Sequence, residues 1–290
     1  MEELSSIDAL RKQVLAWRKA GLRVGFVPTM GNLHGGHLTL VDEARRQADR
    51  IVVSIFVNPT QFSAGEDFSD YPRTYEADCA LLKTKAVDLV FAPSVEALYP
   101  DGPSLQTRVD VPRLNDMLCG LSRPGHFTGV ATVVAKLFNI VQPDLAVFGL
   151  KDYQQLMVIR QMTHDLAWPI EIVGAPIARE PSGLAMSSRN AYLSAEQTEQ
   201  AAVIYQTLTA LADRMSQGEA HLAPLVQAGL SQLTAAGLKP DYLEIRRAAD
   251  LEKAQPGDQS LVILVAAHLG RARLIDNLPV MLPAPGVEEA

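Results

Sequence analysis

The chain has 290 residues, of which 48% are hydrophobic and 20% are charged. This composition excludes a mainly disordered protein, and the length is enough to bury a core without disulfides or metal ions. The formal net charge of -7 argues against bulk binding of nucleic acid or anionic membranes, because neutralising phosphates needs a basic surface. Cys79 and Cys119 form no CxxC motif, so we expect buried thiols in a reducing compartment.

Residues 1–20 predict an amphipathic helix rather than a signal peptide. Apolar residues such as Leu4, Ile7, Leu10 and Val14 return every three or four positions, with charged residues between them. The segment lacks the apolar block of a signal peptide, and no run in the sequence approaches the roughly 20 apolar residues of a membrane span. We therefore expect a cytoplasmic protein with no membrane partner.

The first two thirds of the sequence alternate between strand and helix patterns. Residues 51–57, IVVSIFV, are nearly all apolar and β-branched, as in a strand that is buried on both faces of a parallel sheet. A strand at 22–27 and a helix at 37–49 complete a βαβ unit with it. Helices are then expected at 75–85, 130–141 and 152–166, and strands at 87–91, 145–150 and 170–173. This order predicts an α/β fold with a doubly wound, Rossmann-like parallel sheet.

The pattern changes near residue 176. A polar, irregular stretch at 179–190 is followed by a different succession of elements. Helices are expected at 195–216 and 221–236, and strands at 242–246, 261–267 and 273–276. The sequence therefore predicts a first domain at 1–176 and a smaller α+β domain at 177–290, with a frayed tail after Pro279.

The segment VPTMGNLHGGH, residues 27–37, leaves the first predicted strand and enters the first helix of the sheet. Doubly wound folds bind ligands at this position, and glycines there let an anion approach the backbone and the helix N-terminus. His34 and His37 are three residues apart, so they project from nearly the same helix face. We interpret them as donors to an anion. The alternatives are a helix cap with two surface histidines, and a zinc site for which no third ligand has an evident spacing.

Polar residues also follow two other predicted strands. Asn58 and Gln61 carry amides that can bind carboxylate or hydroxyl groups, although Asn-Pro is also a common turn. Lys151 is expected at the ligand edge of the sheet, where an ammonium can hold phosphate oxygens. Asp152 fits a helix N-cap or a contact to ribose, and Gln155 lies on the same side of the first helical turn.

Three further loops are polar. The stretch LAMSSRN, residues 184–190, offers hydroxyls, a guanidinium and backbone N–H groups that suit a phosphate clamp, with a polar linker as the alternative. The loop at 123–127 contains a basic residue, but its composition assigns it no role. The acidic turn at 66–70 predicts a solvated face.

These motifs resemble those of known enzymes. The HGGH turn at 34–37 resembles the HxGH signature of the nucleotidyl-transfer superfamily, and residues 186–189 are similar to its KMSKS-type loop, with Ala185 in place of the leading lysine. Together with FVNPTQF, DYPRT, RPGHFTGV and FGLKDYQQL, in family order, they make the chain resemble the pantothenate synthetases. It departs from the family pattern at Ser182, where an aspartate is expected, and at Ala178, where a larger aliphatic residue usually packs near adenine.

The resemblance implies an ATP-dependent condensation of pantoate with β-alanine that gives pantothenate, AMP and pyrophosphate through pantoyl adenylate. It implies that His37 is the proton donor. His34, Lys151 and Arg189 would stabilise charge on the phosphates, and Mg²⁺ would be bound with the outer phosphates. No protein side chain is assigned as a metal ligand.

The resemblance also implies where the substrates bind. Pantoate is expected at Gln61 and Gln155, and β-alanine at Gln61. The C-terminal domain would act as a lid that excludes water, and the enzyme would be a homodimer. The residues implied for ATP are Met30, Gly31, Asn32, Leu33, His34, Gly35, Gly36, His37, Gly149, Leu150, Lys151, Asp152, Ala178, Met186, Ser187, Ser188 and Arg189.

Three other functions stay open at this point. A nucleotidyltransferase that stops at an adenylylated product would share the histidine motif but would not depend on β-alanine. The net charge and the lack of a basic anticodon-binding region argue against a tRNA-charging enzyme. A non-catalytic nucleotide-binding regulator is also compatible with the fold, although His34, His37, Lys151 and Arg189 together favour catalysis.

Overall fold

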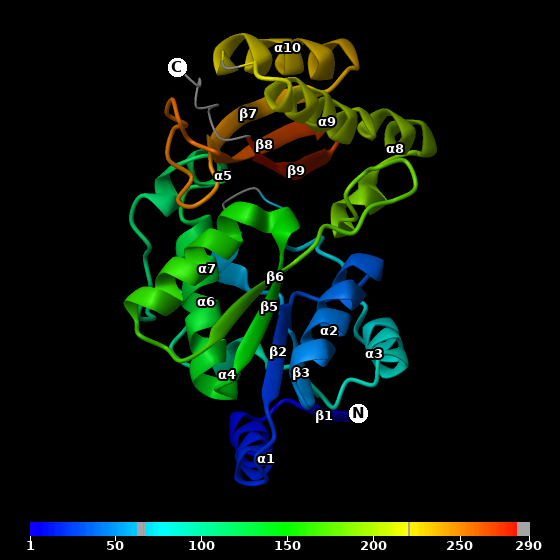
Figure 1. The fold of residues 1–290 in the computed structure, drawn as a ribbon. Helices are drawn as coiled ribbons and strands as arrows, with labels where there is room; N and C mark the ends of the chain where they lie inside the picture. The colour runs from blue at the N-terminus through cyan, green and yellow to red at the C-terminus, as the bar shows by residue number, and fades with distance from the viewer. Residues whose placement is uncertain (63–65, 67, 220, 283–290) are drawn as a thin grey trace. The chain divides into compact units, whose positions relative to one another are not determined.

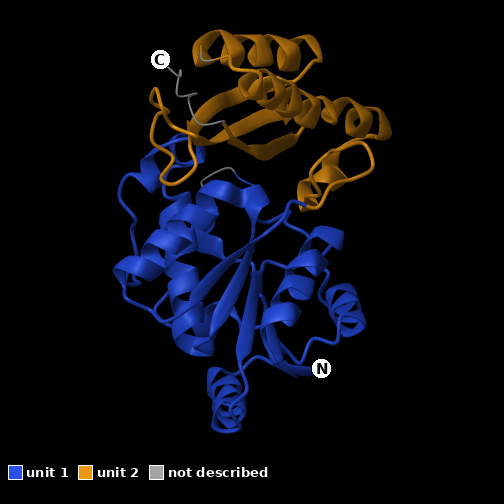
Figure 2. Cartoon of the chain, in the orientation of Figure 1, with its two compact units in different colours: residues 1–177 blue, residues 178–290 orange. Residues whose placement is uncertain are grey.

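The computed structural model describes residues 1–62, 66, 68–219 and 221–282. The chain forms two compact units, Met1–Ile177 and Ala178–Ala290 (Figure 2). The first contains a six-stranded sheet and the second a three-stranded sheet. The predicted α/β fold with a smaller C-terminal α+β part is therefore confirmed. None of the helices in the described ranges has the length and apolar character that crossing a membrane demands.

The strands of the first unit lie in the order β1-β4-β3-β2-β5-β6, and every neighbouring pair is parallel. The chain runs from β2 to β3 and β4 on one side and then places β5 on the other side of β2. The point where the strand order reverses is thus between β2 and β5, where ligands bind in such sheets. The strands are β1 (Glu2–Leu4), β2 (Val24–Thr29), β3 (Arg50–Ile55), β4 (Leu89–Phe91), β5 (Leu145–Gly149) and β6 (Glu171–Ala175).

Helices cover both faces of this sheet (Figure 1). Apolar side chains such as Val27, Ile51 and Val53 are fully buried between these layers, which explains why the strands are apolar on both faces. The helices are α1 (Ile7–Lys19), α2 (Gly35–Gln47), α3 (Tyr75–Thr84), α4 (Val95–Leu98), α5 (Cys119–Ser122), α6 (His126–Val141) and α7 (Tyr153–Asp165). Three 3₁₀ turns, η1 (Pro59–Gln61), η2 (Leu114–Asp116) and η3 (Leu150–Asp152), lie in the connections. Cys79 and Cys119 are buried and form no disulfide.

The expectation of one helix over residues 1–20 is wrong at its start. Glu2–Leu4 instead form an edge strand that pairs with Leu89–Phe91 of β4. The helix begins at Ile7 because the Ser6 hydroxyl caps it and accepts a hydrogen bond from the N–H of Ala9.

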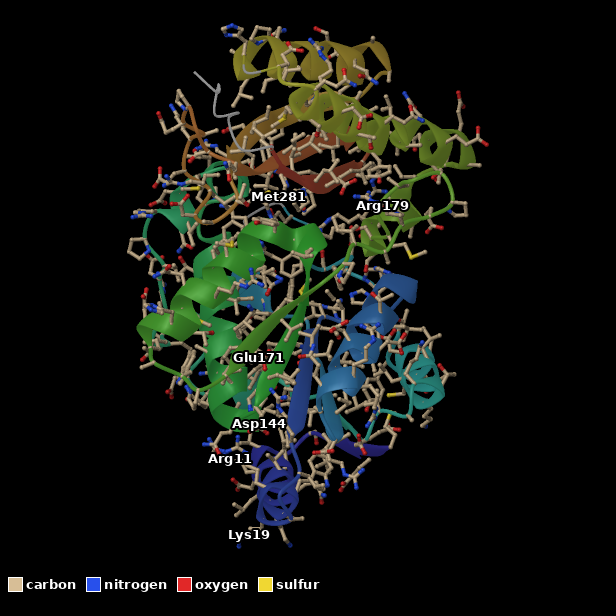
Figure 3. All side chains as sticks on the ribbon, in the orientation of Figure 1. Arg11, Lys19, Asp144, Glu171, Arg179 and Met281 are labelled. Atoms are coloured by element: carbon tan, nitrogen blue, oxygen red, sulfur yellow. The ribbon has the colours of Figure 1, made fainter. Side chains whose placement is uncertain are left out.

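Carboxylates form bonds at the amino ends of β2, β5 and β6. Asp144, just before β5, accepts a hydrogen bond of 2.7 Å from the N–H of Val24. Glu171, the first residue of β6, pairs with Arg23 at 2.6 Å. Figure 3 labels Asp144 and Glu171, with Asp144 close to α1. Both carboxylates therefore bond to groups of the same unit and stabilise its fold.

Asp88 does the same on the other side of the sheet. It precedes β4, accepts a 2.8 Å hydrogen bond from the N–H of Ile51, and pairs with Arg45 and Arg50 at 3.0 Å each. The carboxylate thus ties β3, β4 and α2 together at the amino edge.

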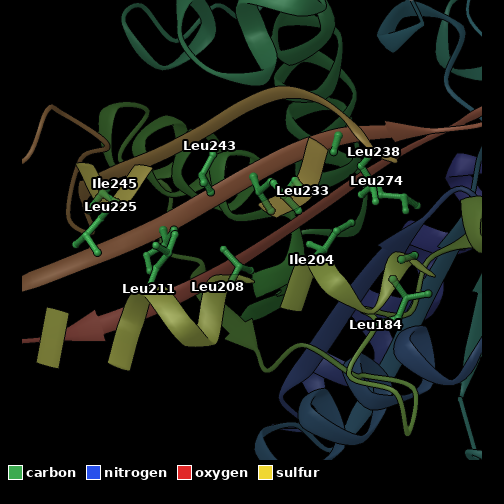
Figure 4. Close-up of a cluster of buried hydrophobic side chains, with 14 of the residues drawn as sticks. Leu184, Ile204, Leu208, Leu211, Leu225, Leu233, Leu238, Leu243, Ile245 and Leu274 are labelled. Carbon is green, nitrogen blue, oxygen red and sulfur yellow. The ribbon is translucent and has the colours of Figure 1, made fainter. Parts of the chain in front are cut away.

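The second unit packs three helices on an antiparallel sheet of order β7-β8-β9. Its strands are β7 (Lys239–Arg247), β8 (Ser260–Leu269) and β9 (Ala272–Met281), and its helices are α8 (Ala195–Ala201), α9 (Val203–Ser216) and α10 (Leu222–Ala235). Leucines and isoleucines of the helices and the sheet, among them Leu208, Leu211, Leu225 and Leu243, form its core (Figure 4).

Two expectations for this unit need correction. The helix expected at 195–216 is interrupted at Ala202, whose N–H bonds to the carbonyl of Glu199, three residues back, and tightens the turn. Val280 and Met281, expected in a frayed tail, still belong to β9, and proline is tolerated at position 279 because β9 is an edge strand. The rest of that tail, from residue 283, lies outside the described residues.

Candidate active site

The carboxyl end of β2 leads into the glycine turn. The Thr29 hydroxyl donates to the carbonyl of Ser54 on β3 at 2.8 Å and accepts from the N–H of Gly31 at 3.2 Å. Gly31 has φ +80°, and a Cβ there would lie 3.0 Å from a carboxylate oxygen of Asp78. Both the positive φ and this close approach require glycine.

Asp78 holds the turn from a distant part of the sequence. This buried carboxylate of α3 accepts hydrogen bonds from the N–H groups of Asn32 at 2.9 Å and Leu33 at 2.8 Å. The Thr74 hydroxyl donates a third bond at 3.1 Å. Asn32 also has a positive φ, of 51°. Asp78 was not predicted from the sequence, because no local spacing signals a bond between residues 46 positions apart.

His34 and His37 cap the first turn of α2 with their own rings. The Nδ1 atom of His34 accepts from the N–H of Gly36 at 3.1 Å, and Nδ1 of His37 accepts from the N–H of His34 at 3.3 Å. The ring centroids are 4.2 Å apart. Because Nδ1 accepts in both rings, the proton of each neutral imidazole is on Nε2. The rings therefore cap the helix through Nδ1, but both are half-buried and not surface residues as the capping alternative supposed. Nε2–H is the second polar group of each ring.

Both histidines are held in the neutral form. Burial lowers the pKa of His34, and the charge of Lys151 lowers it further. Burial, followed by the charge of His34, lowers the pKa of His37 to about 3, although the Asp152 carboxylate opposes this shift. At neutral pH the two rings therefore present N–H hydrogen-bond donors rather than imidazolium charges.

Lys151 supplies the positive charge at this place. It lies in η3, directly after β5, which is the strand next to β2. Its Nζ is 3.7 Å from a carboxylate oxygen of Asp152. Asp152 occupies the N-cap position of α7, but its side chain makes no capping hydrogen bond, so the expected capping bond is absent. The structure thus brings His34, His37, Lys151 and Asp152 together at the reversal point of the sheet.

The two amides after β3 differ in their surroundings. The Oδ1 atom of Asn58 accepts from the hydroxyls of Tyr99 at 2.8 Å and Thr60 at 3.0 Å. Its Nδ2 donates to Oε1 of Gln61 at 3.1 Å, and Nε2 of Gln61 is 2.9 Å from the Met30 sulfur. Asn58 is therefore a structural residue that orients Gln61, and Gln61 lies beside the glycine turn.

Two neighbouring glutamines on α7 differ in the same way. Gln154 is buried, and its amide bonds to Cys119, Leu114 and Met117, which fixes the loop before α6. Gln155 is half-buried, and no residue in the described ranges forms a hydrogen bond with its amide. The geometry therefore favours Gln155 as the residue that meets a ligand.

The loop at 123–127, to which the sequence assigned no role, contacts the Gln61 segment. His126 and Arg123 both bond to the main-chain carbonyl of Gln61. The expectation of a solvated face at 66–70 is wrong for Glu66, because its carboxylate binds Arg123 at 2.6 Å. Residue 67 of this turn lies outside the described residues.

The remaining nucleotide candidates belong to the second unit and lie together there. The N–H of Met186 donates to the carbonyl of Ala178 at 2.9 Å, which closes the loop between them. The Ser187 hydroxyl caps the 3₁₀ helix η4 (Ser188–Tyr192) by accepting from the N–H of Arg189 at 3.3 Å. Arg179, labelled in Figure 3, anchors the loop through Asp276 at 2.6 Å.

No group of three or more His, Cys, Asp or Glu residues is arranged to hold a metal ion in the part of the chain that the structure describes. A zinc ion at His34 and His37 would find no third side-chain ligand there. The Nδ1 atoms of both rings are also already bonded to backbone N–H groups.

Comparison with known proteins gives a consistent result. The sequence profile described as Pantoate-beta-alanine ligase matches residues 2–279. The chain is 56% identical to the pantothenate synthetase of Pseudomonas fluorescens strain Pf0-1 over 98% of this chain and 100% of that one. It is 57% identical to that of Pseudomonas putida strain W619, over 97% and 98% of the two chains.

Solved structures agree with the sequence relatives. The pantothenate synthetase of Thermus thermophilus superposes with a TM-score of 0.88 at 48% identity, over 96% of this chain and 99% of that one. The pantoate-beta-alanine ligase of Francisella tularensis, complexed with beta-gamma ATP and beta-alanine, gives a TM-score of 0.79 at 35% identity, over 96% and 97%. The chain belongs to the pantoate-beta-alanine ligase family.

Proposed function

We propose that this chain catalyses the ATP-dependent condensation of pantoate with β-alanine, and that the reaction proceeds through pantoyl adenylate. A carboxylate does not react with an amine until it carries a good leaving group. The pantoate carboxylate would attack the α-phosphate of ATP and release pyrophosphate. The β-alanine amine would then attack the acyl carbon and release AMP. Family membership supports this reaction.

The observation that carries the proposal is the pair of neutral imidazoles beside Lys151. Negative charge develops on the α-phosphate and on the departing pyrophosphate, so preorganised N–H donors and an ammonium stabilise it. The tautomers of His34 and His37 favour donation of hydrogen bonds from Nε2. With a pKa of about 3, His37 acts in this scheme as a hydrogen-bond donor, a narrower role than the proton donor expected from the sequence.

The backbones of Met30–His37 and Gly149–Asp152 would hold ATP, and Gln61 and Gln155 would hold pantoate. β-Alanine would also bind at Gln61, beside the adenylate. The half-buried amide of Gln155 and the fixed amide of Gln61 support these assignments. Ala178, Met186, Ser187, Ser188 and Arg189 would also bind ATP.

Mg²⁺ fits this site as an ion that arrives with the nucleotide. The described residues offer no cage of carboxylates, and Mg²⁺ in nucleotide sites keeps phosphate and water ligands. When bound, the ion would neutralise charge on the outer phosphates. The protein's own part would be to orient the reacting groups and to exclude water from the adenylate.

The second unit would act as a lid, and the enzyme would form a homodimer. The polar stretch at 179–190 supports a lid, and it predicts that ATP protects this stretch from proteolysis. Equal cleavage with and without ATP would contradict closure. Light scattering of the purified protein would test the homodimer.

The experiment that tests the function follows pyrophosphate and AMP release from ATP, first with pantoate alone and then with β-alanine added. We expect pyrophosphate release to require pantoate, and β-alanine to convert it into steady AMP production. Steady pyrophosphate release without an amine would indicate an adenylyltransferase. The absence of release under both conditions would indicate a nucleotide-binding protein without this activity.

A further inference from the structure

The start of α6 is bonded to the main chain of Gln61. The carbonyl oxygen of Gln61 accepts a hydrogen bond from Nδ1 of His126 at 2.8 Å and one from Nη2 of Arg123 at 3.4 Å. His126 is buried, so this bond is shielded from water. Two side chains that are more than sixty positions away in the sequence therefore fix one carbonyl at the carboxyl edge of the sheet.

Arg123 determines which ring nitrogen of His126 carries the proton. Its Nη1 lies 3.0 Å from Nε2 of His126, and a guanidinium can only donate. Nε2 must therefore accept, and Nδ1 carries the hydrogen that bonds to Gln61. Burial, followed by the charge of Arg123, lowers the pKa of His126 to about 4, so the ring stays neutral. This tautomer is the opposite of the one in His34 and His37.

Glu66 holds Arg123 in this orientation. Its two carboxylate oxygens accept from Nε at 2.6 Å and from Nη2 at 2.7 Å, a two-point contact that fixes the plane of the guanidinium. Both side chains are largely shielded from solvent. The ion pair therefore lets a cationic side chain lie against a neutral imidazole.

The same helix holds the Gln61 turn by direct packing. A Cβ at Gly129 would lie 2.3 Å from the carbonyl oxygen of Thr60, so only glycine allows α6 to approach η1 this closely. The carbonyl of Gly129 accepts from Nδ2 of Asn58 at 3.2 Å, and the same Nδ2 donates to the side chain of Gln61. Gln61 is thus fixed through both its main chain and its side chain.

We propose that Arg123 and His126 are positioning residues for Gln61, which they orient toward the substrate that it binds. The inference rests on the proposed function, in which Gln61 holds pantoate and β-alanine. Glu66 supports both residues through Arg123. Neither Arg123 nor His126 needs to touch a reacting atom for this role.

The test compares two substitutions of His126. His126→Phe keeps the ring volume but loses the donor, and we expect the KM for pantoate to rise about tenfold while the KM for ATP stays within twofold. His126→Asn retains an N–H donor near the position of Nδ1, and we expect it to bring the KM for pantoate back to within about threefold of wild type. Leu121→Ala, an exposed change in the same segment, is the matched control.

A double-mutant cycle separates positioning from a general structural effect. In a Gln61→Ala background, His126→Phe should change the KM for pantoate by less than twofold, because there is no glutamine amide left to position. An equal further loss in that background would overturn the proposal, as would an unchanged KM for pantoate in folded His126→Phe. If His126→Phe does not fold, Arg123→Met carries the same cycle.

Nitrogen NMR of the wild-type histidine rings tests the geometry without any turnover. We expect His126 as the Nδ1–H tautomer, and His34 and His37 as Nε2–H tautomers. The Nε2–H tautomer for His126 would overturn the proposal. If wild-type protein makes no pantothenate from its three substrates, the proposed function itself fails, and the NMR result still stands on its own.

Discussion

Polar side chains have different kinds of partners at the amino edge of the six-stranded sheet, where the strands begin, and at the carboxyl edge, where the strands end. At the amino edge, Asp144 and Asp88 bond to backbone N–H groups of the sheet and to Arg18 of α1 and Arg50 of β3. At the carboxyl edge, His34 and His37 bond through Nδ1 to backbone N–H groups of the described residues, and Nε2–H is a second donor on each ring. Carboxylates with full sets of partners stabilise the fold, whereas side chains that are held by one atom can offer the other to a ligand.

The first prediction concerns the carboxyl edge and has the largest expected effect. His37→Ala removes one preorganised donor, so pantoate-dependent pyrophosphate release should slow by at least about 10²-fold. The lost capping bond should lower the free energy of unfolding by only about 1 kcal/mol. Rapid-quench assays and thermal unfolding of the same sample measure both. Near-normal pyrophosphate release by the folded variant would remove His37 from the mechanism.

The second prediction concerns pH. Folding lowers the pKa of His37 to about 3 and that of His126 to about 4, whereas both should be near 6.5 in the unfolded chain. The unfolded chain therefore binds more protons below pH 6.5, and this contribution to stability is complete above pH 6.5 and is lost as the pH falls. Each ring should lower the free energy of unfolding by up to about 1.4 kcal/mol per pH unit in this window.

Urea unfolding at pH 7, 6 and 5 tests this dependence, because most carboxylates remain ionised over that range. His126→Phe serves as the control, since it should show a shallower loss of stability with acid. Equal stability at pH 7 and pH 5 would mean that the fold does not hold these rings neutral.

The third prediction concerns the amino edge. Asp88→Ala leaves the N–H of Ile51 and two arginines without their acceptor, so the free energy of unfolding should fall by about 2–3 kcal/mol. The kcat should stay within twofold, because the carboxylate lies at the edge opposite the candidate site. Asp88→Asn, which keeps an acceptor for Ile51, should lose less stability. A large fall in kcat for Asp88→Ala would contradict the conclusion that side chains at the amino edge stabilise the fold and those at the carboxyl edge meet the ligand.

The fourth prediction compares a structural and a ligand-binding side chain on one helix, α7. Gln154→Ala removes three hydrogen bonds in a buried place and should cost about 1–2 kcal/mol of stability. Gln155→Ala should leave stability within about 0.5 kcal/mol but raise the KM for pantoate. The two variants are each other's control in unfolding and kinetic assays. If both variants change the stability and the KM for pantoate by similar amounts, the two amides do not have separate structural and ligand-binding roles.

The smallest effect is expected for Glu171→Gln. Its ion pair with Arg23 lies at the surface, where such pairs contribute little. Chemical unfolding should detect a change below about 0.5 kcal/mol, and the activity should not change. A loss above about 1 kcal/mol would mean that this pair is more important to the amino edge than its exposure implies.

Local patterns in the sequence predicted the parts of the fold and site that depend on neighbouring residues. The apolar run at 51–57 indicated a buried parallel strand, and the glycines before His37 indicated a turn at the ligand edge. Lys151 was placed at the end of a strand by the same reasoning. In each case the signal lies within about ten residues of the feature that it predicts.

The features that were missed depend on long-range contacts. Asp78 reaches Asn32 across 46 positions, and Arg123 reaches Glu66 across 57, so neither spacing has a local signature. Glu2–Leu4 form a strand only because β4 offers them an edge. Asp152 stands at an N-cap position, yet its carboxylate lies near Lys151 instead of capping the helix.

The bond between Asp78 and the glycine turn affects how the chain can vary over evolution. Position 31, with φ +80° and a close approach to Asp78, requires glycine, and position 32, with φ +51°, favours Gly, Asn and Asp. The buried carboxylate that fixes these values restricts a third position in another helix. A turn that is shaped in advance also lets a ligand bind with little loss of conformational entropy. Sequence drift at these three positions should therefore be coupled, while the exposed face of α3 varies independently.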